Sequence, residues 1–237
     1  MLGTTIHKGE HCNFLPLSRS DKSVRSEAKQ TLFFNTPIRI VSAGAVVGEK
    51  ESEGPLKNYF KRVKKDIKMG EKNFERAEIL MFDEAVRTAL SEARQTVGDA
   101  QVLISGDLLN QMTTSSYTAR NLDLPHLGVY SACSTYTEAI SLGATLIDAG
   151  HFETVACATA SHFATAERQF RYPSEYGCQH PPYAQWTVTA AGCCILSSKG
   201  NGPLVRSATL GKVVDFGQND LSNMGAAMAP AAMDTMC

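Results

Sequence analysis

The stretch that begins at Leu127 changes from a strand pattern to a helix pattern within a few residues. Leu127, Val129 and Tyr130 are apolar or favour strands, and apolar residues then recur at three- and four-residue spacing as far as Ile147. The change falls at Cys133. A strand that runs directly into a helix is the repeating unit of α/β folds, so this stretch predicts such a fold with Cys133 on the turn.

The turn at Cys133 has two interpretations. The first amide N–H groups of the following helix, those of Ser134 and Thr135, would be free to meet an anion. The positive end of the helix dipole also favours a thiolate, which makes Cys133 a candidate nucleophile. On the other hand, free cysteine is among the most commonly buried small residues, and an inert Cys133 remains open.

Composition limits the class of protein. The chain has 237 residues, is 43% hydrophobic and carries a formal net charge of −1. These values are typical of a globular protein of one or two domains, and the lack of basic charge argues against a general nucleic-acid binder. The seven cysteines are odd in number and form no CxxC pair, which favours reduced thiols over disulfides. We also expect no metal site, since the neighbouring His7, His11 and Cys12 are best explained as a chance cluster. The uncharged run 176–198 is broken by Pro181 and Pro182, so we expect no membrane span.

The remaining pattern predicts a series of strands and helices. Residues 48–68 are highly charged and predict a solvated loop followed by a surface helix. A long amphipathic helix is expected from Phe74 to Ala93. Glycines 200 and 202 predict a turn that joins the last two strands in a pair. The expected strands, besides the one before Cys133, are residues 38–47, 101–105, 154–160, 187–196 and 204–214.

Three side chains follow predicted strands: Asp107, Cys133 and His162. In open α/β sheets ligands bind at the carboxyl ends of the strands, so we expect these three to converge on one cleft. An N-cap role is an equally good interpretation of Asp107.

A long segment, residues 164–186, is typical of a binding loop or lid. Arg168 and Arg171 are interleaved in it with aromatic residues and could hold a carboxylate. Pairing of the two arginines with Glu167 and Glu175 is the alternative, and the sequence does not separate the two.

From about Pro37 onward the chain resembles a known family. The residues that carry the resemblance are the strings SGDLLNQ, ACSTYTEA, ATASHFATAERQFRYPSEYG, QWTVTAAG and MGAAMAPAAMDT. They are similar to the stage V sporulation protein AD family of spore-forming Firmicutes. The chain departs from the family pattern at Ser131 and Cys178, where glycine is expected.

The resemblance implies a fold. Members have a thiolase-like layered α/β fold, of which this chain would form the N-terminal half, a mixed five-stranded sheet with helices, without the second half. Residues 1–36 would then be a polar, disordered extension, residues 37–220 the N-terminal half, and residues 221–237 the start of a truncated second half.

The resemblance also implies a function. The family belongs to the SpoVA proteins, which move dipicolinic acid into the forming spore and out at germination, and implies a non-catalytic dipicolinate-binding component. Its localisation would be peripheral at the spore inner membrane, with other SpoVA proteins and possible homodimers as partners. We expect no cofactor, and calcium only within a calcium dipicolinate ligand. The expected ligand-binding residues are Asp107, Cys133, Ser134, Thr135, His162, Arg168 and Arg171.

Two other functions stay open at this stage. One is an acyl-transferring enzyme of the thiolase or ketoacyl-synthase type with Cys133 as nucleophile. The other is a scaffold that only docks other SpoVA proteins.

Overall fold

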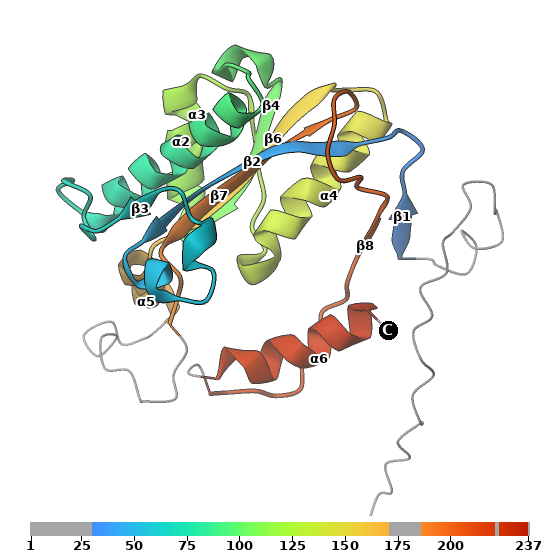
Figure 1. Cartoon of the computed structure of the whole chain (residues 1–237). Coiled ribbons are helices and arrows are strands. Elements are labelled where there is room, and N and C mark those ends of the chain that lie inside the picture. The colour runs from blue at the N-terminus through green and yellow to red at the C-terminus, as the bar shows by residue number, and fades with distance from the viewer. Residues whose placement is uncertain (1–29, 171–185, 221–222, 237) are drawn as a thin grey trace, which may run out of the picture.

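The computed structural model describes residues 30–170, 186–220 and 223–236. Figure 1 shows one central twisted sheet with helices on both faces and a separate helix, α6, beside it. The strands are β1 (Thr31–Phe33), β2 (Arg39–Gly48), β3 (Val63–Lys64), β4 (Val102–Asp107), β5 (His126–Gly128), β6 (Thr154–Ser161), β7 (Ala190–Ser197) and β8 (Ser207–Thr209). The α-helices are α2 (Phe74–Glu92), α3 (Thr113–Leu122), α4 (Thr135–Asp148), α5 (Phe163–Phe170) and α6 (Met224–Met236). Short 3-10 segments are η1 (Lys50–Glu53), η2 (Lys57–Tyr59), η3 (Val97–Asp99), η4 (Asn110–Met112) and η5 (Ala132–Ser134).

The central sheet has six strands in the order β3-β2-β7-β6-β4-β5. Strand β7 runs antiparallel to both of its neighbours, β2 and β6, and the other neighbouring pairs are parallel. Strands β2, β3, β4, β5 and β6 therefore all end at the same edge of the sheet. This carboxyl edge is where α/β folds place ligands.

Each face of the sheet is covered by helices with an apolar side. Helices α2 and α3 pack on one face, where the core includes Met81, Phe82 and Leu103. Helix α4 packs on the other face, where Ile104, Ile147 and Leu196 are buried. Because both faces are covered, β6 is almost entirely buried, which explains why its sequence TVACATAS shows no alternation of polar and apolar residues.

The α/β fold class predicted from the sequence is confirmed, and so are the expected central strands. The sheet has six strands instead of the expected five because the two-residue β3 adds an edge beside β2. The surface helix expected within residues 48–68 was wrong: η1, η2 and β3 occupy this segment. Gly54 and Pro55 interrupt it, and its charges leave no apolar stripe to bury.

Two further expectations differ from the structure. The strand pair expected around Gly200 to Gly202 was wrong, because β8 pairs with β1 in a small separate sheet. Leu204 instead forms an isolated bridge with Arg39 of β2. The segment expected to be a loop from residue 164 lies in helix α5 as far as Phe170, whereas residues 171–185 lie outside the described residues.

The two ends of the chain also bear on the sequence predictions. Residues 1–29 of the predicted extension lie outside the described residues, and Thr31–Phe33 within it form β1. Near the other end, α6 lies apart from the sheet. Within the described residues, the helices are all too short or too polar to cross a bilayer.

Candidate functional site

Asp107 ends β4 and is almost fully buried, with 1% of its surface exposed. Its Oδ1 accepts a hydrogen bond from the amide of Leu109 at 2.9 Å. Its Oδ2 accepts from the amide of Ser115 at 2.6 Å and from the hydroxyl of Ser115 at 2.7 Å. Asp107 thus fixes the connection into α3, the capping type of role that was the alternative to ligand binding, and it offers little to a ligand.

Cys133 lies in η5, between β5 and α4, as the sequence predicts, and its thiol is exposed. Contrary to the expectation, the neighbouring amides are not free. Ser134 N–H donates to the carbonyl of Ser131 at 2.9 Å, and Thr135 N–H donates to the carbonyl of Ala132. The tight 3-10 turn before the helix uses these donors internally. The anion site expected at the start of α4 therefore lacks the donors on which it was based.

The turn also explains one of the two departures from glycine. Ser131 has a negative φ of −142°, so it does not need the positive φ that favours glycine. The strained residue is its neighbour Ala132, with φ 44°. The other departure, Cys178, lies outside the described residues.

His162 follows β6 and is fully buried. Its Nδ1 accepts a hydrogen bond from the amide of Ala164 at 3.2 Å, so the proton is on Nε2, which lies 2.9 Å from the carbonyl oxygen of Ile67. Its ring stacks on Phe163 and contacts Phe74. Through these buried contacts, His162 helps to hold the carboxyl edge of the sheet in place. The side chain of Arg168 and the whole of Arg171 lie outside the described residues.

A cavity of about 330 Å³, here called the Trp186 pocket, opens at the same carboxyl edge. It lies where β2, β3 and β6 end and β7 begins. This volume is at the lower end of the range for small-molecule sites, roughly 300–1,000 Å³. The lining residues that carry the argument are Lys50, Glu51, Lys65, Ile67, Phe163 and Trp186.

The wall of the Trp186 pocket is aromatic. Trp186 is 49% exposed, and its ring lies 5.9 Å from that of Phe163 at an angle of 58°. Lys50 Nζ lies 3.6 Å from the centre of the Trp186 ring, a cation–π contact. Thr189 forms the support below: its amide donates to Glu51 Oε1 at 3.0 Å, and its hydroxyl accepts from the amide of Phe163 at 3.1 Å.

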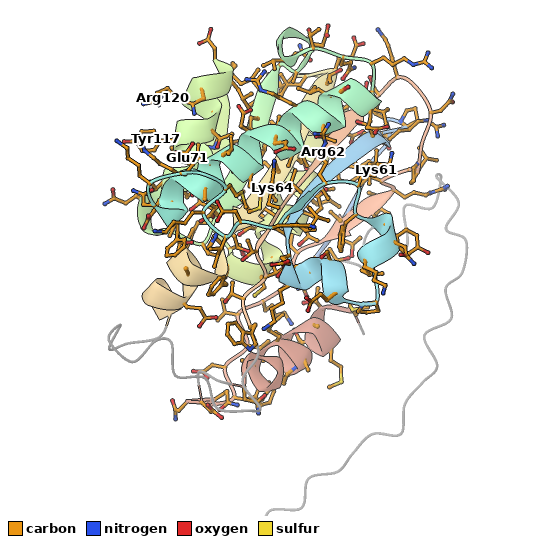
Figure 2. All side chains as sticks on the ribbon, turned by 60° about the vertical axis from the view of Figure 1, so that its left-hand side comes forward. Lys61, Arg62, Lys64, Glu71, Tyr117 and Arg120 are labelled. Carbon is orange, nitrogen blue, oxygen red and sulfur yellow. The ribbon has the colours of Figure 1, made fainter. Side chains whose placement is uncertain are left out.

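Charges of both signs border this pocket. Lys50 and Lys65 have no ion-pair partner within the described parts of the chain, whereas Lys64 pairs with Glu84 on α2. Figure 2 shows Lys61, Arg62 and Lys64 near one another along one segment, and Lys64 lines the pocket. Glu49 and Glu51 supply the negative charge, and Oε2 of Glu51 is buried without a partner among the described residues.

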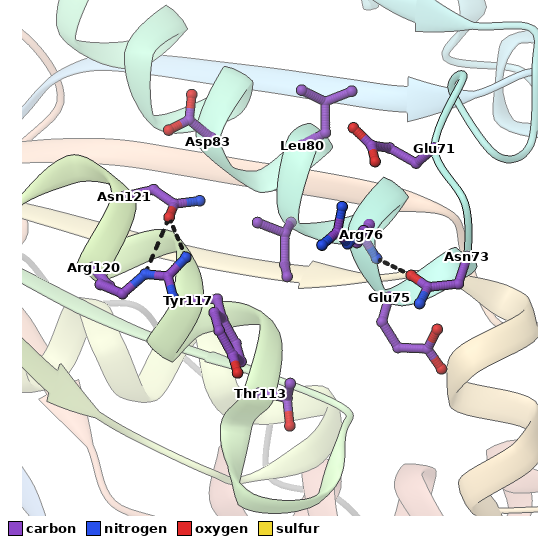
Figure 3. Close-up of a pocket in the computed structure, with 11 residues that line it drawn as sticks. Glu71, Asn73, Glu75, Arg76, Leu80, Asp83, Thr113, Tyr117, Arg120 and Asn121 are labelled. Carbon is purple, nitrogen blue, oxygen red and sulfur yellow. Dashed lines mark hydrogen bonds between the residues drawn. The ribbon is translucent and has the colours of Figure 1, made fainter.

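A second and larger cavity, about 550 Å³, lies between α2 and α3 (Figure 3). Arg120 lies over Tyr117 there, at 4.7 Å from the ring centre, and donates to the side chain of Asn121. Acidic groups outnumber basic ones in this groove, so it suits an anion less well than the Trp186 pocket. Its charged lining residues are Glu71, Glu75, Arg76, Asp83 and Arg120.

Comparison with known proteins decides the family. A model of the family "Stage V sporulation protein AD (SpoVAD)" matches residues 28–237. The stage V sporulation protein AD of Bacillus subtilis (strain 168) is 44% identical over 208 residues, which cover 88% of this chain and 62% of that protein. The chain belongs to the stage V sporulation protein AD family. It spans 62% of the length of this relative.

Solved structures of thiolase-like enzymes are similar to this SpoVAD family member at low identity. The 3-oxoacyl-[acyl-carrier-protein] synthase III of Aquifex aeolicus VF5 is 14% identical with a TM-score of 0.46, over 69% of this chain and 55% of that one. A variant of OleA from Xanthomonas campestris is 14% identical with a TM-score of 0.48, over 70% of this chain and 59% of that one. Similarity at these identities and TM-scores does not assign an activity to this chain.

Sequence reasoning on this family member missed the residues of the Trp186 pocket. Lys50 lies in a charged run that is typical of a solvated loop. Trp186 lies at the end of a segment whose predicted role rested on Arg168 and Arg171. One signal was available: Trp186 is the single tryptophan of the chain and shortly precedes a buried strand. Among the described cysteines, Cys157, Cys193 and Cys194 are buried free thiols.

Proposed function

We propose that this sporulation protein is a non-catalytic binding component for dipicolinic acid and that the Trp186 pocket is its binding site. The Trp186 pocket is the observation that carries the proposal. Dipicolinate is a planar aromatic dianion, which requires a flat apolar wall for its ring and cations for its carboxylates. Trp186 and Phe163 offer the wall, and Lys50 and Lys65 offer two ammonium groups without ion-pair partners in the described structure.

The acidic side of the pocket suits a calcium chelate of the same ligand. Carboxylate oxygens are preferred calcium ligands, and Glu49 and Glu51 lie in this pocket. Asp107, expected in that role from the sequence, has both oxygens occupied by protein donors. We propose that calcium arrives as part of the ligand, with no calcium held by the protein alone.

The wider assignment follows from the family. We propose that the protein acts with other SpoVA proteins in dipicolinate uptake during sporulation and release in germination, peripherally at the spore inner membrane. A homodimer through the thiolase-like interface belongs to the same proposal.

Calorimetric titration with dipicolinate, with and without calcium, tests the ligand. We expect saturable binding that weakens as salt is added, since the attraction is between charges. Lys50→Ala or Lys65→Ala should each weaken binding about tenfold, the equivalent of one charged hydrogen bond. Lys61→Ala is the matched control, because Lys61 pairs with Glu92 on the surface and does not line the pocket. A pyridine with one carboxylate should bind less tightly than dipicolinate.

Other outcomes would assign a different function. Absence of dipicolinate binding to the wild type would leave the scaffold function. The exposed thiol of Cys133 is the observation that favours an acyl-transferring enzyme. No base forms a hydrogen bond with that thiol within the described residues, whereas such chemistry requires one. A stable acyl group on Cys133 after incubation with acyl-CoA would favour the enzyme.

A further inference from the structure

Residues 56–68, here called the 56–68 surface, form one lateral edge of the molecule. They contain η2 and β3, and β3 is the outermost strand of the central sheet beside β2. Phe60 and Lys64 are partly buried, and the other residues of this segment are exposed. Lysines on an edge strand often only prevent it from pairing with another sheet. Strand β3 has two residues, so such protection does not explain the charges along the whole segment.

The 56–68 surface concentrates positive charge. The formal net charge of the whole chain is −1, yet this segment has six basic side chains and one acidic side chain, that of Asp66. The carboxylate of Asp66 accepts hydrogen bonds from the amides of Lys68 and Gly70, so it is used within its own turn. The basic residues are Lys57, Lys61, Arg62, Lys64, Lys65 and Lys68.

Some of these cations remain for an external anion. The ion pairs with α2 are those of Lys61 with Glu92, and of Arg62 and Lys64 with Glu84. Glu53 and Glu71, which flank the segment, offset part of its charge but form no ion pair with it in the described structure. The basic residues of the segment without an ion-pair partner among the described residues are Lys57, Lys65 and Lys68.

Large apolar side chains are exposed among these cations. Tyr59 is 80% exposed, Leu56 57% and Ile67 42%. Single exposed apolar residues are ordinary, but here they alternate with unpaired lysines along one short segment. This combination suits the surface of an anionic bilayer, because lysines attract the headgroups while apolar side chains enter the boundary of the acyl region. A nucleic acid would also attract the lysines but would leave Leu56 and Ile67 without an apolar partner.

The 56–68 surface borders the Trp186 pocket. Lys64, Lys65 and Ile67 line that pocket together with Trp186, whose ring is 49% exposed. A bilayer in contact with this surface would therefore lie beside the mouth of the pocket. Trp186 is the single tryptophan of the chain, so its emission reports on this place alone.

We propose that the 56–68 surface is the membrane-binding face of the protein and that it takes the headgroups of an anionic bilayer. The lysines bind lipid phosphates, and Leu56 and Tyr59 enter the boundary of the acyl region. The inference rests on the peripheral membrane location proposed above and names the residues that produce it. It does not depend on the binding of dipicolinate.

Flotation of the full chain with lipid vesicles tests the role of the charges. We expect binding to vesicles of equal parts phosphatidylglycerol and phosphatidylcholine, weaker binding as salt is added, and little binding to phosphatidylcholine alone. Replacing both Lys57 and Lys68 by Gln should lower the partition coefficient about fivefold for each lysine, about 25-fold together. Replacing both Lys199 and Lys212 by Gln is the matched control, because it removes the same charge from exposed residues outside this surface.

A second pair of variants tests the apolar side chains. Replacing both Leu56 and Tyr59 by Ser should weaken binding to the anionic vesicles about tenfold, since two exposed side chains no longer enter the lipid. Replacing both Val213 and Phe216 by Ser is the matched control, because these residues are also exposed but lie after β8. All the replaced side chains are exposed, and circular dichroism of each variant checks that it folds as the wild type does.

Trp186 emission locates the contact without any substitution. Vesicles that carry brominated acyl chains should quench Trp186 when they are anionic and leave it unchanged when they are neutral. Binding of the wild type without quenching would overturn the proposal. Equal losses in the 56–68 variants and in their controls would also overturn it, and so would binding of duplex DNA that depends on Lys57 and Lys68 in the absence of vesicle binding.

The outcomes for this surface and for the ligand are separate. Vesicle binding that is unaffected by the 56–68 variants would overturn this surface and keep the peripheral location, whereas absence of vesicle binding by the wild type would overturn both. Neither Lys57 nor Lys68 lines the Trp186 pocket, so the variant without these two lysines should still bind dipicolinate in calorimetry without vesicles. Failure of the wild type to bind dipicolinate would overturn the ligand and leave the vesicle result in force.

Discussion

At the scale of single residues, Glu78 makes the stability of the fold depend on pH. Its pKa is 4.5 when exposed and about 8 in the folded protein, where burial of this α2 side chain disfavours the charged form. Because the folded value is the higher one, the stabilisation is complete below pH 4.5 and is lost as pH rises through 8. We expect the free energy of unfolding to fall by about 1.4 kcal/mol per pH unit between these values from this group alone.

Glu78→Gln should remove this slope. The variant should lose less stability than the wild type as pH rises, so the difference between their free energies of unfolding should change by several kcal/mol across the interval. Urea unfolding at a series of pH values, at one low protein concentration, measures this difference. A constant difference between wild type and Glu78→Gln at all pH values would show that Glu78 has the same pKa in the folded and the unfolded protein.

The same scale shows what the sequence could predict of the candidate site. Asp107, Cys133 and His162 do follow strands that end at one edge of the sheet. Their roles could not be predicted, because a role depends on which donors are left over after local turns have formed. Ser115 and Ala164, both later in the chain, occupy the polar atoms of Asp107 and His162. No spacing rule indicates such partners.

At the scale of elements, the prediction succeeds where burial dictates the pattern. The strands that lie under helices on both faces have continuous apolar sequences, and α2 has a clear apolar stripe. It fails for η1, η2 and β3, which are held by a few ion pairs and edge hydrogen bonds instead of apolar burial. The Trp186 pocket is built in part from these elements, and for this reason the sequence did not reveal it.

Gly106 of β4 lies close to Val129 in the segment after β5, and this close packing leads to a prediction. A Cβ atom at this position would lie 1.9 Å from the carbonyl oxygen of Val129, a backbone atom that cannot move aside alone. Gly106→Ala should therefore destabilise the protein by about 1–3 kcal/mol or more. Gly192→Ala is a matched control, since a Cβ there meets nothing within 4 Å and both glycines pair with Thr159. Denaturant unfolding of the two variants checks this; equal stabilities would mean that β4 is not held against Val129.

At the scale of the whole molecule, the segment from β8 to α6 leaves apolar side chains in solvent. Val213 is fully exposed, Phe216 is 72% exposed, and Met233 and Met236 of α6 are 66% and 77% exposed. Figure 1 shows α6 beside the sheet and not on it, so neither core covers these residues. Apolar surface of this kind, gathered in one segment, promotes association.

We therefore expect this 237-residue chain to associate as its concentration rises. Sedimentation velocity over a concentration series should show species larger than the monomer, and the thermal transition should shift with concentration. Replacing both Val213 and Phe216 by Ser should reduce association, because it removes apolar area without touching either core. Replacing Leu56 and Tyr59 by Ser is the matched control, since these residues are also exposed but lie on or beside η2. A reversible unfolding transition of a monomer, independent of concentration, would contradict this expectation, and equal effects of the two double variants would place the contact elsewhere.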